Sequence, residues 1–258
     1  MSSPNLTVTD GASGLRIEHL RKSYRKKTVI RDFSMELNRG EVVALLGPNG
    51  SGKTTTFYSV AGLVTPEGGS VKVDGTDVTT LPMYRRAQLG IGYLPQEMSI
   101  FRGLSVQDNI AAILDIAEPN RNKRRARLED LLSEFSIEHL RRAPALALSG
   151  GERRRVEIAR CLAAEPKYLL LDEPFAGVDA ATEKAIIAVL KSLREAGKTV
   201  VVVHHDLATV TEYFDNVFLI NTRSIAEGPV AQAFTEETLQ AAYGGRLATS
   251  QIDQLAKV

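Results

Sequence analysis

Residues 47–55 read GPNGSGKTT, a glycine-rich run that ends in a lysine and two threonines. Gly47 to Thr54 match the spacing G-x-x-x-x-G-K-[ST], after the apolar run EVVALL and before a stretch of helical character. Glycines let backbone N–H groups wrap phosphate oxygens, and Lys53 adds a cation for the β- and γ-phosphates. The Thr54 hydroxyl is a ligand suited to Mg²⁺. This loop therefore predicts a site for a nucleotide and Mg²⁺.

A second run, YLLLDEP at 168–174, is an apolar strand that ends in two carboxylates. Ligands of open α/β sheets bind beyond the carboxyl ends of the strands. Asp172 can hold Mg²⁺, through water, and Glu173 can orient and deprotonate an attacking water. Two adjacent acids near Mg²⁺ favour hydrolysis of the nucleotide over its storage.

A third run, LSGGERRRVEIAR at 148–160, reads as the start of a helix with an unusual first turn. Ser149 and Glu152 match the S-x-x-E capping box. Two glycines and three arginines do not follow from a cap, because cations oppose the helix dipole at this end. Glycines permit close backbone approach, and an exposed helix N-terminus binds anions. The run therefore predicts contact with a nucleotide phosphate.

The elements that must position these residues follow from the apolar pattern. Residues 40–46, 167–171 and 198–203 are continuous apolar runs, typical of strands buried on both faces of a parallel sheet. Residues 15–24 and 70–78 have short alternating stretches, broken by Asp and Gly in 70–78, as small antiparallel strands do. Because helical patterns, including TEKAIIAVLKSLREAG, separate the apolar runs, we expect a doubly wound α/β core.

The stretch between about Glu97 and Leu162 is mostly helical in pattern. Leu128, Leu131, Leu132 and Phe135 share one helix face. The basic run NRNKRRAR at 120–127 precedes that face and is expected to be solvated. Residues 1–14 are polar and aperiodic, so we expect a disordered tail, and 246–258 are expected to form a second tail.

Composition excludes several classes of protein. The 258 residues carry 32 basic and 31 acidic side chains, a net charge of +1 that gives no general reason to bind nucleic acid. The single cysteine, Cys161, excludes an internal disulfide and suits a reducing compartment. The N-terminus lacks the charged and apolar regions of a secretion signal. No apolar run approaches the ~18 residues of a membrane span, so membrane crossing would need another chain.

Taken together, LSGGE, GPNGSGKTT and YLLLDEP resemble the ATP-binding cassette family, the ATPase subunits of ABC transporters, over about residues 15–245. The resemblance implies a P-loop NTPase (RecA-like) core with a mainly parallel sheet, a small antiparallel β region and an inserted helical subdomain at about 97–162. It implies an ATPase that uses ATP and Mg²⁺, forms an ATP-dependent head-to-tail homodimer and works with two transmembrane transporter subunits, without nucleic acid. It also implies a cytoplasmic location, peripheral on the inner face of the bacterial inner membrane.

In such a dimer, each ATP lies between the P-loop of one subunit and LSGGE of the other. The resemblance implies that N–H groups of the serine and glycines of the signature meet the γ-phosphate, and that the three arginines face outward or pair with acids. The nucleotide-binding residues that it implies are Tyr24, Gly47, Pro48, Asn49, Gly50, Ser51, Gly52, Lys53, Thr54, Thr55, Ser149, Gly150, Gly151 and Asp179.

Individual positions are implied by the same resemblance. Tyr24 matches the aromatic that stacks on adenine, and Asp179 the aspartate that bridges the two sites. Gln96 matches the glutamine that reaches Mg²⁺ and the attacking water. His205 is preferred over His204 as the switch histidine, since the family places this histidine directly before an acidic or amide residue. The catalytic set is thus Glu173, His205 and Gln96, and the metal set is Thr54, Gln96 and Asp172.

Three other functions fit the sequence less well than a transport motor. DNA-repair cassettes insert a long coiled coil between the P-loop and the signature, and no sustained heptads occur here. Translation-type members carry two cassettes in one chain, whereas this sequence has a single set of motifs. A catalytically dead regulator is disfavoured because Glu173 and His205 are both present. Small P-loop kinases lack LSGGE.

The two ends of the chain indicate different cargoes. Residues up to about 178 resemble the ATPase of the lipopolysaccharide exporter of Gram-negative bacteria, on stretches such as GIGYLPQEMSIFRGLSVQDNI. Residues from about 179 resemble manganese or zinc importer ATPases, on stretches such as KTVVVVHHDL and FTEETLQAAYGG. A natural recombinant, an engineered chimera or a designed sequence would each explain the join.

The partner surface is expected in the exporter-like part. In this family, membrane subunits insert short helices into a groove near the residues around Gln96. Apolar side chains available there as anchors are Met98, Ile100, Phe101 and Leu104, unless they fill the core instead. Because this surface lies in the exporter-like part of the chain, we expect docking to lipopolysaccharide-exporter subunits rather than to a metal importer.

Overall fold

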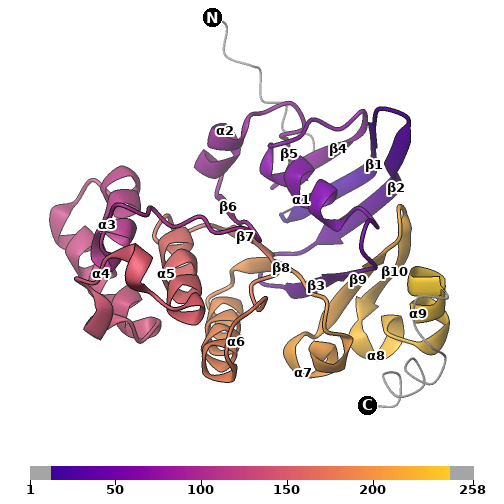
Figure 1. Cartoon of the computed structure of the whole chain (residues 1–258). Coiled ribbons are helices and arrows are strands. Elements are labelled where there is room, and N and C mark those ends of the chain that lie inside the picture. Colours follow the sequence, from indigo (N-terminus) through magenta and orange to yellow (C-terminus); the bar gives the residue numbers. More distant parts are fainter. Residues whose placement is uncertain (1–12, 245–258) are drawn as a thin grey trace, which may run out of the picture.

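The computed structural model describes residues 13–244, which form two β-sheets and the helices around them (Figure 1). The larger sheet has the order β10-β9-β3-β8-β7-β6; its strands run parallel except β10, which is antiparallel to β9. Its strands are β3 (Val42–Leu46), β6 (Ile91–Leu94), β7 (Tyr168–Asp172), β8 (Thr199–Val203), β9 (Asn216–Ile220) and β10 (Ser224–Pro229). The expected P-loop NTPase architecture is confirmed. The apolar runs expected as parallel strands are β3, β7 and β8, whereas β6 and β9 were not assigned from the sequence.

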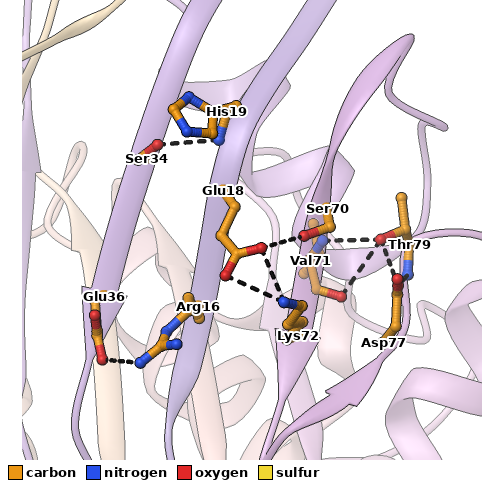
Figure 2. Close-up of polar contacts among 10 residues, drawn as sticks. All are labelled: Arg16, Glu18, His19, Ser34, Glu36, Ser70, Val71, Lys72, Asp77 and Thr79. Atoms are coloured by element: carbon orange, nitrogen blue, oxygen red, sulfur yellow. Dashed lines mark hydrogen bonds and ion pairs between the residues drawn. The ribbon is translucent and has the colours of Figure 1, made fainter. Parts of the chain in front are cut away.

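The smaller sheet is antiparallel, in the order β2-β1-β4-β5, as the alternating segments predicted. Its strands are β1 (Leu15–Tyr24), β2 (Lys27–Leu37), β4 (Gly68–Val73) and β5 (Thr76–Asp77). On its outer side, Glu18 accepts from the Ser70 hydroxyl and from Lys72 on the neighbouring strand (Figure 2). These partly buried contacts link β1 to β4, and the opposite face of the sheet is buried.

Helices cover the sheets and extend beyond one end of the larger one (Figure 1). They are α1 (Lys53–Ala61), α2 (Met83–Gln88), α3 (Val106–Ala117), α4 (Arg121–Glu134), α5 (Gly150–Leu162), α6 (Ala180–Glu195), α7 (Val210–Tyr213), α8 (Val230–Ala233) and α9 (Glu236–Tyr243), with 3₁₀ turns at Glu138–Leu140, Ala145–Ala147 and Leu207–Thr209. No helix among residues 13–244 has the length and apolar character needed to cross a bilayer.

Strand β3 shows how the parallel sheet separates two cores. Val43 and Leu45 pack with α1 and the antiparallel sheet, whereas Ala44 and Leu46 pack with the helices on the other face. Successive side chains of a strand point to opposite faces, so a strand between two cores must be apolar throughout. This is the reason why β3, β7 and β8 could be found in the sequence.

The helices α3, α4 and α5 form a layer at the edge of the molecule, beyond β6 (Figure 1). Leu131, Leu132 and Phe135 are buried there and Leu128 is partly buried, as the periodicity predicted. The basic run forms the first half of α4, capped by the Asn120 side chain. The expected tails lie outside the described residues, apart from positions 13 and 14.

Candidate nucleotide-hydrolysis site

The P-loop connects the end of β3 to the N-terminus of α1. Gly47 has no room for a side chain, because a Cβ there would lie 2.1 Å from the Ile220 carbonyl oxygen. The first turn of α1 contains no acidic residue, so the N–H groups and dipole of this helix end are available to an anion. The sequence therefore shapes a tight loop that presents backbone donors to phosphate.

Lys53 is buried at the base of the loop. Its Nζ donates to the Gly47 carbonyl at 2.6 Å and to the Pro48 carbonyl at 3.0 Å. Burial lowers the pKa of Lys53 to about 8, against the opposing effect of the Glu173 and Asp172 carboxylates. A nearby polyphosphate would favour the ammonium form, so the residue is suited to an anionic ligand.

Glu173 follows the last residue of β7, and two residues from the adjacent strands meet its carboxylate. Gln96, shortly after β6, donates from Nε2 to Oε2 at 2.9 Å. His205, shortly after β8, places Nε2 2.6 Å from Oε1. Because β6, β7 and β8 are parallel neighbours, the three side chains emerge at one edge of the sheet. The sheet order thus brings the three expected catalytic residues together.

The backbone of Glu173 lies in a conformation that L-residues seldom adopt, with φ of 51°. Its N–H donates to the Val203 carbonyl at 3.2 Å, and its own carbonyl accepts from Ala176 at 3.1 Å. Strained backbone of this kind persists only where surrounding contacts hold it, and it is common at active sites.

These side chains and the P-loop enclose a cleft of about 350 Å³. It is lined by Val29, Asn49, Gly50, Ser51, Gly52, Lys53, Thr54, Thr55, Gln96, Glu173 and His205. Among the expected P-loop and acidic residues, Gly47, Pro48 and Asp172 are buried and do not line the cleft. Tyr24, at the end of β1, does not line the cleft and is 44% exposed, with Lys22 above its ring. Val29 lines the cleft without any signal in the sequence.

Asp172 has the character of a metal ligand. It is 1% exposed, and its Oδ1 has no hydrogen-bond partner among the described residues. Burial, and then the charge of Glu173, raise its pKa to about 6. In residues 13–244 no group of three or more His, Cys, Asp or Glu gathers that could bind a metal ion by itself. Asp172 and Thr54 therefore fit Mg²⁺ that is held together with nucleotide phosphates.

The two histidines of VVVVHHD point into different surroundings. His205 faces the cleft, whereas His204 is buried among the rings of Phe175, Tyr213 and Phe214 and bonds the Thr209 hydroxyl at 2.8 Å. Burial lowers the pKa of His204, which keeps the ring neutral. Of the two histidines, His205 is thus the one that lines the cleft and contacts Glu173, and its role as the switch histidine stays a prediction.

The N-terminus of α5 carries the expected capping box between Ser149 and Glu152. Ser149 and Gly150 are exposed, and the Ser149 N–H donates to the Glu152 carboxylate at 2.8 Å as part of that capping box. Gly151 is buried against the start of α6, where a Cβ would lie 2.4 Å from the Thr182 hydroxyl. Asp179 caps α6 by accepting from the Thr182 N–H at 2.8 Å. Close packing of two helix starts therefore explains the second glycine.

The three arginines of α5 do not share one environment. Arg153 donates to the Leu148 carbonyl, and Arg155 donates to the carbonyls of Phe135 and Ser136. All of these bonds lie within the helical layer. Arg154 is 6% exposed and pairs with Glu157, but its other bonds go to main-chain carbonyls. Arg154 does not face outward, and its pair with Glu157 matches the other alternative expected for these arginines. No sequence signal distinguished it from the arginines beside it.

Comparisons with known proteins identify the family of the chain. Residues 30–176 match the family model described as ABC transporter. A probable ABC transporter ATP-binding protein from Azorhizobium caulinodans is 53% identical over 206 residues, which is 80% of this chain and 73% of that protein. The lipopolysaccharide export system ATP-binding protein LptB of Haemophilus influenzae is 46% identical over 233 residues, covering 90% of this chain and 97% of the relative.

Among solved structures, the dimeric post-hydrolysis state of the ATP-binding cassette MJ0796, bound to ADP and Pi, superimposes with a TM-score of 0.76 at 27% identity. The match covers 84% of this chain and 98% of that one. With the P-loop, the paired acids and the signature helix in place, these matches show that the chain belongs to the ABC transporter family, as an ATP-binding subunit whose ATPase activity is coupled to transport.

Proposed function

We propose that this protein is the motor subunit that couples ATP binding and hydrolysis to lipopolysaccharide extraction and export through separate membrane subunits. The observation that supports the motor function is the carboxylate of Glu173, held between Gln96 and His205 at the edge of the P-loop cleft. The support for the cargo is similarity to LptB proteins over 90% of the chain. An alignment of 233 of the 258 residues must extend beyond residue 178, so the similarity to LptB continues past the join between the exporter-like and importer-like parts.

In the proposed reaction, the P-loop N–H groups and Lys53 bind the triphosphate, and Tyr24 stacks on adenine. Thr54, Asp172 and Gln96 would hold Mg²⁺, which when bound neutralises charge on the β- and γ-phosphates. Glu173 accepts a proton from the attacking water, and Gln96 and His205 orient the carboxylate through its two oxygens.

The second half of each site would come from another copy of the chain. The proposed dimer is head-to-tail and ATP-dependent. The N–H groups of Ser149, Gly150 and Gly151 would meet the γ-phosphate from the partner subunit, for which the Ser149 N–H would have to exchange its bond to Glu152 for one to the phosphate. Asp179 would bridge the two sites. The same proposal treats 15–245 as the nucleotide-binding domain, with the helical subdomain at about 97–162.

Docking to two membrane subunits is proposed at the surface beside Gln96. Met98, Phe101 and Leu104 are exposed by 47%, 43% and 37%. Ile100 is buried in the core and cannot act as an anchor. The protein would then lie in the cytoplasm, peripheral on the inner face of the bacterial inner membrane. The second candidate is the motor of a manganese- or zinc-type importer, favoured by the sequence of the last third of the chain.

Co-expression with exporter membrane subunits and, separately, with a manganese-type permease tests the proposal. We expect stable co-purification with the exporter subunits. Phe101→Glu should abolish co-purification by placing a charge in an apolar contact. Because Arg160 lies 4.4 Å from the ring, the new glutamate could pair with it. Phe101→Ala avoids such a pair and should weaken co-purification. Ile116→Glu is the matched control, because Ile116 is also apolar and exposed, by 85%. Co-purification with the permease alone would replace the exporter by the importer.

A further inference from the structure

Arg154 lies in the second turn of α5, and its guanidinium group points at the end of β7. Nη2 donates to the carbonyls of Asp172 and Glu173, both at 3.0 Å, and Nε donates to Pro174 at 3.2 Å. Nη1 donates to the Pro95 carbonyl at 2.9 Å and contacts Glu157 at 3.4 Å. One side chain therefore binds the backbone of three consecutive residues and of a second loop.

The carbonyls that Arg154 binds flank two of the catalytic groups. Three of them belong to the turn that carries Glu173, whose positive φ needs support from its surroundings. The fourth belongs to Pro95, the residue directly before Gln96. The planar guanidinium presents five donors in a fixed arrangement, and a lysine ammonium could not reproduce this fork.

We infer that Arg154 is a positioning residue, which holds the Glu173 turn and the Gln96 loop of its own subunit in the geometry needed for hydrolysis. The inference rests on the proposed function, in which the first turn of the same helix serves the ATP site of the partner subunit. The signature helix then has a role in both sites: its first turn acts on the partner's nucleotide, and its second turn acts on the catalytic carboxylate of its own chain.

The neighbouring arginine supplies a matched control. Arg155 is one position along the same helix and also donates to main-chain carbonyls, at 3.1 Å and 3.3 Å, but these belong to Phe135 and Ser136 in the helical layer. Arg155→Gln removes a charge and two comparable bonds without touching either catalytic loop. The change in hydrolysis of Arg155→Gln therefore measures the general effect of losing an arginine from α5.

Steady-state kinetics of the dimer provide the first test. Arg154→Gln should lower kcat by roughly 10²-fold, the scale of a misplaced catalytic group, with KM and nucleotide affinity unchanged within about twofold. Arg154→Lys should recover part of kcat, since it keeps the charge and some donors. Arg155→Gln should keep kcat near that of the parent. Equal kcat values for Arg154→Gln and Arg155→Gln, in variants with the parent's circular dichroism spectrum, would overturn the inference.

Defined heterodimers, purified through two different tags, test which of the two ATP sites Arg154 serves. If Arg154→Gln folds poorly, Arg154→Lys can replace it in the same heterodimers. In one heterodimer, Arg154→Gln and Glu173→Gln are on opposite subunits, so the only live Glu173 lies in the Arg154 variant. In the other, both changes are on one subunit and the live Glu173 lies in an unaltered chain. We expect slow hydrolysis in the first and single-site hydrolysis in the second. The reverse order, or equal rates, refutes the inference. Failure of any ATP-dependent dimer to form would refute the proposed function instead.

Discussion

The adjacent histidines His204 and His205 allow activity and stability to be separated in one experiment. His205 contacts the Glu173 carboxylate at 2.6 Å and is exposed to the cleft. His205→Ala removes a group that orients the catalytic carboxylate, so kcat should fall by roughly 10²-fold. Because the ring is not buried in a core, the free energy of unfolding should change by less than about 0.5 kcal/mol.

His204→Ala should have the opposite profile. The ring is 4% exposed and packs against three aromatic rings, so truncation leaves a cavity and removes the bond to Thr209. The Thr209 hydroxyl keeps its bond to the Asp206 carbonyl, so no buried group is orphaned. Lost packing and one hydrogen bond together predict a loss of about 2–4 kcal/mol. Activity per folded molecule should change only slightly.

Urea unfolding followed by circular dichroism, combined with a steady-state ATPase assay at saturating ATP, measures both quantities on the same samples. The reasoning requires that each substitution affects mainly one of them. A His204 variant that is stable and inactive, together with a His205 variant that is unstable and active, would refute the assignment of the switch histidine.

The remaining predictions use other features of the same site. Tyr24→Ala should weaken ATP binding by roughly 1 kcal/mol, as expected for one lost aromatic stack, in a fluorescent-nucleotide titration. Tyr84→Ala, which removes another exposed ring with an arginine above it, should leave affinity unchanged, and equal affinities for both variants would exclude Tyr24 from the adenine site. Burial lowers the pKa of His204 below its usual 6.5, so below that pH the unfolded chain binds a proton that the native ring does not. The free energy of unfolding should therefore fall as pH drops through about 6.5 and below, and His204→Phe should lose this part of the pH dependence; an unaltered profile in chemical denaturation would contradict it.

The parallel strands that carry the site were accessible from sequence because burial on both faces leaves a continuous apolar run, as in β3, β7 and β8. Strand β6 was not assigned, because it lies at the sheet edge and contains Gly92 and Tyr93, which are only partly buried. Without β6, residue patterns alone could not place Gln96 beside Glu173; that expectation came from family resemblance. Contact between the two depends on strand order, which local periodicity does not encode.

The sequence also could not distinguish side chains of the same chemical type that lie in different surroundings. Arg153, Arg154 and Arg155 are identical in type, and only the phase of α5 against β7 turns the middle one toward the Glu173 backbone. Among the apolar residues after Gln96, Ile100 is in the core while Phe101 is exposed, a difference set by tertiary packing. The capping box of α5 was predictable, because Ser149 and Glu152 satisfy each other within four residues.

In the proposed cycle, two copies of this chain close around ATP, and Glu173 then takes a proton from the water that attacks the γ-phosphate. The most direct measurement is gel filtration with light scattering of Glu173→Gln, with and without saturating ATP and Mg²⁺, beside an ATPase assay of the same protein. We expect a monomer without nucleotide, a stable dimer with ATP, and hydrolysis far below that of the parent chain. A monomer at saturating ATP and Mg²⁺, or hydrolysis at the parent rate, would contradict it.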